Sequence, residues 1–209
     1  MSLRHALLAL LDVGPMTGYD LARIFGDTIE HAWRANHSQI YPGLRIMETE
    51  GLIVATAVER GVHATKREYT ITDRGREELA RWAEEPFAIP AERSVAHLHA
   101  MYLEYASFDT ARRQFREHRD HYAAKRLGWL QHSEALRNRD TNLMRLRLAA
   151  KPEYAHDAIV AYKVHVYDGL IARADLEIEW AVKGLTLVEE LAATQENAAL
   201  GPGPCPLTV

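Results

Sequence analysis

Side chains that can pair with nucleic-acid bases or bind phosphate are concentrated in two short segments of the first third of the chain. Glutamine pairs bidentately with adenine and arginine with guanine in the DNA major groove, whereas lysine and the hydroxyls of serine and tyrosine suit phosphate oxygens. A solvated surface contains the same residue types, so this composition leaves both interpretations open. The side chains are His37, Ser38, Gln39, Tyr41 and Arg45 in one segment, and Arg60, His63, Lys66 and Arg67 in the other.

Residues with metal-binding or catalytic potential occur without the spacing that such sites need. The chain has 11 histidines, but His97 and His99 fall on different faces of a helix. His118 and His121 share one face without a third ligand near them, whereas zinc sites need three or four ligands. No Gly-rich phosphate loop, Gly-x-Ser-x-Gly or His-Glu-x-x-His motif occurs. We therefore expect no metal, no cofactor and no enzymatic activity.

Apolar residues at helical spacing predict three helices before residue 52. Gly14-Pro15 ends the first helix, and Thr17 caps the second with Asp20 as its capping-box partner. The third starts near residues 36–38, and Gly51 lies where a glycine commonly ends a helix. The expected buried positions are Leu3, Leu7, Leu10 and Leu11, then Leu21, Ile24 and Phe25, then Ile40, Leu44 and Met47.

Two β-branched segments, residues 52–58 and 67–72, predict a two-stranded hairpin. A fourth helix follows from Thr72 or Asp73, and we expect it to bury Leu79, Trp82 and Ala83. Three helices, a hairpin and a helix are the order of a winged helix–turn–helix domain. The second helix of its helix–turn–helix pair lies in the DNA major groove, and the wing can touch the neighbouring backbone or minor groove.

The rest of the chain predicts long helices. We expect one from about residue 91 to 107, a second with Asp109 as its N-cap, and a last one opened by Lys151-Pro152. If continuous to about Ala193, the last helix would be ~60 Å long, so a second copy of the chain is expected to pack on it. Its expected apolar stripe is Ala155, Ile159, Tyr162, Val166, Leu170, Ala174, Ala181, Leu185 and Val188.

The fold class is therefore mainly α: an amino-terminal winged helix–turn–helix with a two-stranded wing, then an all-α part with long helices. The prolines at 86 and 90 indicate a break, because both cannot lie inside one helix. We predict a winged domain over 1–86, a linker over 87–90, a helical dimerisation domain over 91–194 and a disordered tail over 195–209.

Composition restricts the function classes further. The chain has 209 residues, a formal charge of −4 and 47% hydrophobic residues, which are values of a globular protein. Residues 1–86 hold 10 basic and 13 acidic side chains, so bulk charge alone would not suggest nucleic-acid binding. Cys205 is the single cysteine, which excludes an intramolecular disulfide. No apolar run reaches membrane-spanning length, and we expect a cytoplasmic protein without membrane contact.

The first 86 residues resemble the PadR-type transcriptional regulators. The resemblance rests on a Gly-Tyr-acid-Leu step, an Ile-Tyr-Pro step, a Glu-Gly-Leu step and a wing strand in this order. These are residues 18–21, 40–42, 50–52 and 66–72 of this chain, with Leu7 to Leu11 and Gly14-Pro15 before them. The helical half is similar in pattern to the longer PadR subgroup, whose carboxy-terminal domain dimerises. His37 stands where the family usually has a glycine.

The resemblance implies a dimeric, sequence-specific DNA-binding regulator, with repression favoured, on a pseudo-palindromic operator. It makes DNA contact the preferred role for the two polar segments and for the Tyr19 hydroxyl, although Tyr19 also suits a half-buried structural site. His37 is as suited to a bystander role as to phosphate. Strand alternation places Lys66 and Arg67 on opposite faces, so one should bind phosphate and the other pair with Glu59 or Glu68.

Family members respond to phenolic or flat aromatic compounds, which suggests an effector pocket near Trp129, Tyr162 and Trp180. Core packing is the simpler role for these aromatic side chains. Two alternatives to the repressor remain open: an activator of the same family, and a ligand-binding or protein-interaction module that keeps the winged fold without DNA affinity.

Overall fold

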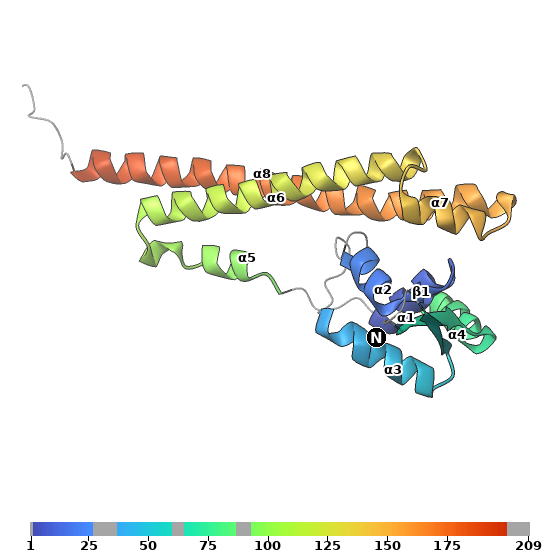
Figure 1. Ribbon diagram of the computed structural model, residues 1–209. Coiled ribbons are helices and arrows are strands. Elements are labelled where there is room, and N and C mark those ends of the chain that lie inside the picture. The colour runs from blue at the N-terminus through green and yellow to red at the C-terminus, as the bar shows by residue number, and fades with distance from the viewer. Residues whose placement is uncertain (1, 27–36, 60–64, 87–92, 200–209) are drawn as a thin grey trace, which may run out of the picture. The chain divides into compact units, whose positions relative to one another are not determined.

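The computed structural model describes residues 2–26, 37–59, 65–86 and 93–199 (Figure 1). In the amino-terminal region the helices are α1 (Ser2–Leu11), α2 (Gly18–Ile24), the 3₁₀ helix η2 (His37–Gln39), α3 (Ile40–Thr49) and α4 (Asp73–Glu84). The strands are β1 (Met16–Thr17), β2 (Ile53–Glu59) and β3 (Thr65–Ile71). This order confirms the predicted winged helix–turn–helix.

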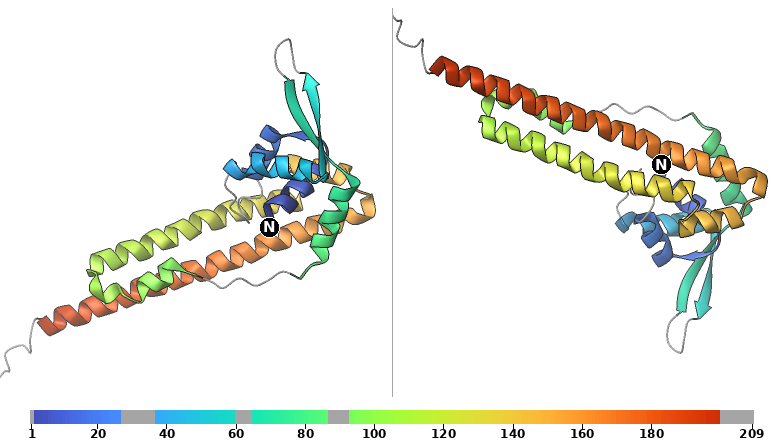
Figure 2. Two further views of the ribbon diagram at one scale, coloured as in Figure 1. Left: turned by 90° about the horizontal axis from the view of Figure 1, so that it is seen from below. Right: turned by 90° about the horizontal axis from the view of Figure 1, so that it is seen from above.

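The predicted two-stranded hairpin is confirmed, and a short third strand, β1, extends it to a three-stranded sheet. Its order is β1-β3-β2, and both pairings are antiparallel. Met16 pairs with Tyr69 at one end of β3, and Ile53 pairs with Ile71 in the wing. A two-residue strand is too short to show alternation, so only its pairing with a distant segment identifies it. Beyond the sheet's base, β2 and β3 project from the helices of this region as a hairpin (Figure 2).

One apolar core holds these elements together. α1 lies at its centre because its leucines recur at helical spacing, and four of them are almost completely buried. α3 contributes one face, and the sheet closes the core through residues of β2 and β3. The predicted core positions of the first three helices are buried, except that Leu3 and Ile24 are only partly buried against the core. Buried core residues include Leu7, Leu8, Leu10, Leu11, Leu21, Phe25, Ile40, Leu44, Met47, Ile53, Tyr69 and Ile71.

Helix ends follow the predicted cap chemistry. The Thr17 hydroxyl accepts a hydrogen bond from the Asp20 amide and donates one to its carboxylate at 2.6 Å, which confirms the cap of α2. Thr72 caps α4 by accepting from the Gly75 amide. Gly51 has φ +71°, the left-handed conformation that ends α3. A Cβ at Gly75 would lie 2.2 Å from the Leu52 carbonyl oxygen, so α4 packs on the sheet through a glycine.

Two side chains of α4 are not buried as predicted. Trp82 is 39% exposed, and its ring stacks on the buried His5 imidazole at a centroid distance of 4.7 Å. Ala83 is exposed. His5 also pairs with Glu78, so α1 and α4 meet through polar and aromatic contacts. A helical face that shows apolar periodicity can therefore lie at the edge of a core.

The helices after residue 92 differ from prediction at their boundaries. The single helix expected over 91–107 is α5 (Val95–Ala100) followed by the 3₁₀ helix η3 (Leu103–Tyr105). α6 (Phe108–Arg137) is capped by Ser107, whose hydroxyl accepts from the Thr110 amide, and not by Asp109. Pro152 precedes the 3₁₀ helix η4 (Glu153–Ala155), and α8 (His156–Ala199) extends past residue 194. α7 (Asn142–Ala149) was not predicted.

The chain divides into two compact units, and each unit combines two separate stretches of the sequence. Residues 1–89 and 133–167 form the first unit, and residues 90–132 and 168–209 form the second. In the first unit, Arg147 of α7 donates to the Ala9 carbonyl at 2.6 Å, and Lys151 pairs with Asp12 at 2.6 Å. Leu143 packs against the winged-domain core. Part of the predicted dimerisation region therefore buttresses the winged fold.

In the second unit α6 and α8 run antiparallel. Arg112 pairs with Glu189, His118 with Glu177 and Arg126 with Asp175, so residue numbers rise along one helix and fall along the other. The buried side of α8 carries small residues at heptad-like spacing, Ala174, Ala181 and Val188.

None of the described helices is long and apolar enough to cross a membrane.

The predicted stripe of α8 is wrong in its first half. Tyr162 is 76% exposed and Val166 is also exposed, whereas Val164 and Tyr167 are buried. The buried side follows steps of three and four in alternation. Repeated steps of four, as in the prediction, drift around the helix because 3.6 residues make one turn.

Candidate nucleic-acid interface

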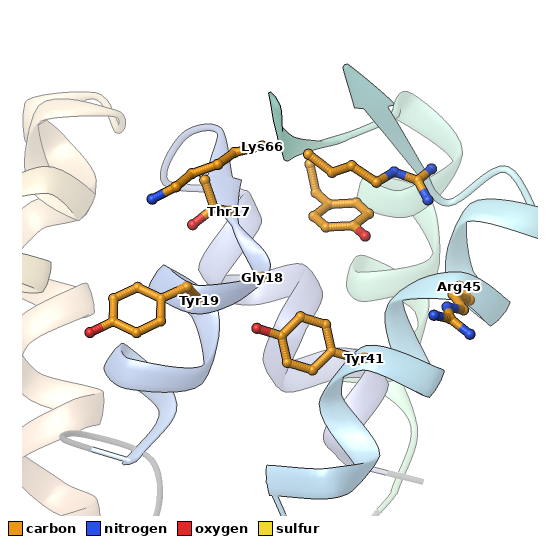
Figure 3. A pocket seen from close by; sticks show the side chains of 8 residues that line it. Thr17, Gly18, Tyr19, Tyr41, Arg45 and Lys66 are labelled. Carbon is orange, nitrogen blue, oxygen red and sulfur yellow. The ribbon is translucent and has the colours of Figure 1, made fainter. Parts of the chain in front are cut away.

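A hollow of about 340 Å³ lies where α2, α3 and the wing meet. It brings together residues from segments far apart in the sequence, and Figure 3 shows the side chains around it. Five of the residues predicted to contact DNA line it: Tyr19, Tyr41, Arg45, Lys66 and Arg67. The lining residues are Thr17, Gly18, Tyr19, Tyr41, Arg45, Lys66, Arg67 and Tyr69.

Tyr41 lies directly over the first turn of α2. A Cβ at Gly18 would lie 2.7 Å from Cε1 of the Tyr41 ring, so the close approach depends on the glycine. Tyr19, the next residue, is 65% exposed and Tyr41 is 50% exposed. Both phenol groups therefore stand at the surface beside α3, in the position that suits hydrogen bonds to a phosphate backbone. The half-buried structural role considered for Tyr19 is not what the structure shows.

α3 separates its faces as the sequence predicts. Ile40, Leu44 and Met47 are buried, whereas Gln39, Tyr41 and Arg45 are exposed. Gln39 occupies the N-cap position without a side-chain capping hydrogen bond, so its amide is not used to cap the helix. Ser38 is exposed beside it.

The two cations of β3 have different surroundings. Nη2 of Arg67 donates to both carboxylate oxygens of Glu48, at 2.6 and 2.9 Å, and its guanidinium lies 5.8 Å from the Tyr69 ring centroid. Lys66 is exposed and forms no ion pair with a residue that the structure describes. Arg67 therefore pairs with Glu48 and not with the predicted Glu68, whereas the side chain of Glu59 lies outside the described residues. Arg67 and Tyr69 share the strand face that meets the last turn of α3, where Glu48 lies.

Asp20 adds a negative charge near the hollow. The hydroxyl of Thr17 holds the pKa of Asp20 below its ordinary value, with smaller contributions from the charges of Arg23 and Lys66. This carboxylate is therefore ionised at neutral pH. Asp20 lies on the same helix as Tyr19. The positive charge of Lys66 in the wing attracts the carboxylate of Asp20.

Some residues that line the hollow or lie exposed on α3 were not predicted from the sequence. Thr17 and Tyr69 line the hollow because β1 pairs with β3, a pairing without a sequence signal. Ile46 is a 53% exposed apolar side chain on α3 next to Arg45, and such a side chain can contact a thymine methyl group. The available signal was that Ile46 directly follows Arg45, two residues after the buried Leu44 position, and so falls on the exposed side of the helix. The predicted contacts Arg60 and His63, and the side chain of His37, lie outside the described residues.

The aromatic residues proposed for an effector have different surroundings. Trp180 lies among His97, Phe115 and His118, with ring centroids 4.3, 5.3 and 5.0 Å away, and lines a hollow of about 50 Å³. Trp129 is buried, and its described cationic neighbour is Lys125 at 5.8 Å. Tyr162 belongs to the other compact unit. Trp180 therefore adjoins a hollow of the second unit.

A wider hollow of about 430 Å³ adjoins the same part of the second unit. It shares His99, Leu103 and Gln114 with the smaller one, and its lining is mostly apolar. Leu98, Tyr102, Tyr105 and Ala106 complete it. Among the described residues no group of three or more His, Cys, Asp or Glu side chains is placed to hold a metal ion.

The amino-terminal part of the chain is similar in sequence to known proteins. The model of the transcriptional regulator PadR-like family matches residues 7–81. A probable transcriptional regulator of Mycobacterium tuberculosis, Rv1176c, is 44% identical over 88 residues, and the negative transcriptional regulator PadR of Bacillus subtilis is 40% identical over 80. The amino-terminal part of the chain therefore resembles the PadR-like family. These alignments cover 42% and 38% of this chain and 47% and 44% of the relatives.

Solved structures of PadR-like proteins resemble a larger part of the chain. Bacillus subtilis PadR in complex with operator DNA matches with a TM-score of 0.70 and 26% identity, over 90% of this chain and 99% of that one. The Vibrio cholerae virulence activator AphA matches with a TM-score of 0.65 and 23% identity, over 91% and 99%. The PadR likeness thus extends from the winged domain into the helices that follow it.

Proposed function

We propose that this PadR-like chain is a transcriptional repressor that binds double-stranded DNA through α3 and the wing. The hollow of α2, α3 and β3 carries the proposal, because it sets two exposed tyrosines and the cations Arg45 and Lys66 beside the exposed face of α3. Phosphate oxygens need such hydroxyl and cationic donors, and a helix with a polar exposed face fits the major groove.

The residues divide by role. Gln39 and Arg45 on the exposed side of α3 are the base readers, since their planar groups can pair bidentately with adenine and guanine. Tyr19, Tyr41 and Lys66 bind the phosphates on either side. Support comes from Bacillus subtilis PadR, whose structure with operator DNA has the related fold.

We infer that the chain acts as a homodimer through its carboxy-terminal helices. In the second unit several large apolar side chains are exposed, among them Tyr105, Met101 and Leu98 near α5 and Leu176, Leu187 and Leu191 on α8. Exposed apolar surface of this kind marks an interaction face, and a second copy satisfies it with two-fold symmetry. Two α3 helices would then meet the half-sites of a pseudo-palindromic operator.

Repression relieved by a small aromatic effector is the finer part of the proposal. The curated Bacillus subtilis relative is a negative regulator, and a PadR structure holds p-coumaric acid. In this chain the hollows beside Trp180, with His99 and Gln114 as polar groups in an apolar lining, suit a flat molecule with one hydrogen-bonding group. A transcription assay on the bound promoter separates repression from activation.

Salt-dependent binding to the DNA upstream of its own gene tests the function. Fluorescence anisotropy should show affinity that falls as salt rises from about 50 to about 200 mM, and tighter binding to one sequence than to a scrambled duplex. Binding that ignores salt, or that ignores sequence, would instead favour a module that keeps the winged fold without operator recognition.

A further inference from the structure

Arg67 lies in the proposed DNA interface, yet its guanidinium already donates to Glu48 of α3, the proposed recognition helix. We propose that Glu48 withholds Arg67 from the DNA backbone and thereby lowers the sequence-independent part of the affinity. The proposal deepens the proposed function and rests on it.

The contact is specific in geometry. One terminal nitrogen of Arg67 lies 2.6 Å from Oε1 and 2.9 Å from Oε2 of Glu48, and the buried Tyr69 ring lies beside the guanidinium. Glu48 is on the last turn of α3 and Arg67 is on β3, so the pair links the recognition helix to the wing. The two side chains are 55% and 31% exposed, which leaves the pair open to an approaching phosphate.

The other cations of the hollow are not neutralised in this way. Neither Arg45 nor Lys66 forms an ion pair with any residue in the described part of the chain. A free cation releases counterions when it meets a phosphate, whereas a cation paired with a carboxylate must first lose that partner. Lys66 should therefore contribute to the salt dependence of binding, and Arg67 should not.

Stability does not explain the pair. Exposed ion pairs contribute about 0–1 kcal/mol, because solvent screens the charges and two long side chains lose freedom. A carboxylate beside a phosphate-binding hollow repels the DNA backbone, so its presence there reduces binding to every sequence. The amino-terminal half, with its net negative charge, limits non-specific binding by the same effect.

Measuring the salt dependence of binding tests the proposal directly. Glu48→Ala should bind operator and scrambled duplexes more tightly by similar factors. The slope of log K against log salt should steepen by about 0.9, because the released Arg67 gains one phosphate contact. Arg67→Gln alone should leave the slope unchanged, and Glu48→Ala/Arg67→Gln should return it to the wild-type value. Glu48→Gln checks the result if the alanine variant folds poorly by circular dichroism.

Glu50→Ala is the matched control. It removes the same charge from the same end of α3, but its partner is Arg4, which does not line the hollow. If Glu50→Ala steepens the slope as much as Glu48→Ala, net charge explains the gain and the proposal is wrong. A slope that falls by about 0.9 in Arg67→Gln would also overturn it, because Arg67 would then already bind phosphate. A wild-type chain without salt-dependent DNA binding overturns the proposed function, and this inference with it.

Discussion

At the residue scale, the interface depends on a few side chains held by close contacts. Tyr41 reaches its place because Gly18 has no Cβ, and Arg67 is held by Glu48. Lys66, one residue before Arg67, points to the other side of β3 and remains available. Adjacent residues of like charge thus have different roles, since alternate side chains of a strand face opposite ways.

Replacing Lys66 tests its role as a phosphate ligand. Lys66→Ala should weaken binding to all duplexes about equally and reduce the salt slope by about one, because one counterion-releasing contact is lost. Anisotropy titrations at several salt concentrations measure both quantities. Lys183→Ala, an exposed lysine of α8 paired with Glu179, serves as the control. An unchanged slope in Lys66→Ala would remove this lysine from the interface.

Replacing Gln39 tests base reading. Gln39→Ala should cost about 1–3 kcal/mol at one operator position and leave binding to scrambled DNA nearly unchanged, because a bidentate base pair is lost and no phosphate contact is. A panel of single-base operator variants gives the measurement. An equal loss on every variant would show that Gln39 positions the helix and does not read a base.

At the element scale, helix packing places charged groups where water is scarce. α7 and the start of α8 bring Arg147 and Lys163 together in the first unit, and burial lowers the pKa of both. The pKa of Lys163 falls to about 8, with the charge of Arg147 as the second cause. Tyr167, one turn further along α8, is buried and its pKa rises to about 12.

This lysine predicts a pH dependence of stability. Between pH 8 and 10.5 the unfolded chain binds more protons at Lys163 than the folded chain, so the free energy of unfolding should rise with pH in that window. Below pH 8 Lys163 is charged in both the folded and the unfolded chain, so the full cost of burying its charge lowers the free energy of unfolding. Lys163→Met should therefore be roughly 1–3 kcal/mol more stable at pH 7 and lose much of the rise up to pH 9.5.

Urea denaturation at pH 7 and pH 9.5 measures the effect, and the upper limit avoids the titration of Tyr167. Lys183→Met is the control, because the Lys183 side chain is 74% exposed and its removal should leave the pH dependence intact. If Lys163→Met retains the full rise, the lysine is not the group responsible.

At the scale of the whole molecule, the chain combines a winged domain with long helices that share its packing. α7 belongs to the compact unit of the winged domain, so a change near α7 can reach α1 through Arg147 and Lys151. The second unit carries exposed apolar side chains on α5 and α8. In the proposed dimer, two joined DNA-binding sites would raise the effective concentration of the second site, which would compensate for an interface with few unpaired cations.

The dimer is tested by charge placed on α8. Leu187→Arg/Leu191→Arg should produce a monomer in sedimentation velocity, because these side chains are one turn apart and 53% and 51% exposed, so the monomer core does not need them. Operator affinity should fall by at least tenfold as the half-sites become independent. Gln195→Arg adds a charge to the same helix without removing apolar surface. A double variant that still sediments as a dimer would place the interface elsewhere.

Local signals carried much of the architecture. Leucine spacing, the threonine caps and the left-handed Gly51 predicted α1, α2, α3 and the start of α4 from neighbouring residues alone. The exposed side of α3, with Gln39, Tyr41 and Arg45, follows from the same periodicity. These features depend on contacts within a few residues, so neighbouring residue types are enough to predict them.

Only the tertiary structure decided which distant segments meet. The pairing of β1 with β3, the contact of Arg67 with Glu48 and the packing of α7 on α1 join residues from 19 to 138 positions apart. The seam of α8 likewise follows from what faces it, because Tyr162 and Val166 are as apolar as the buried Val164 and Tyr167. Periodicity identifies a helix and its candidate faces, but the partner that excludes water determines which face is buried.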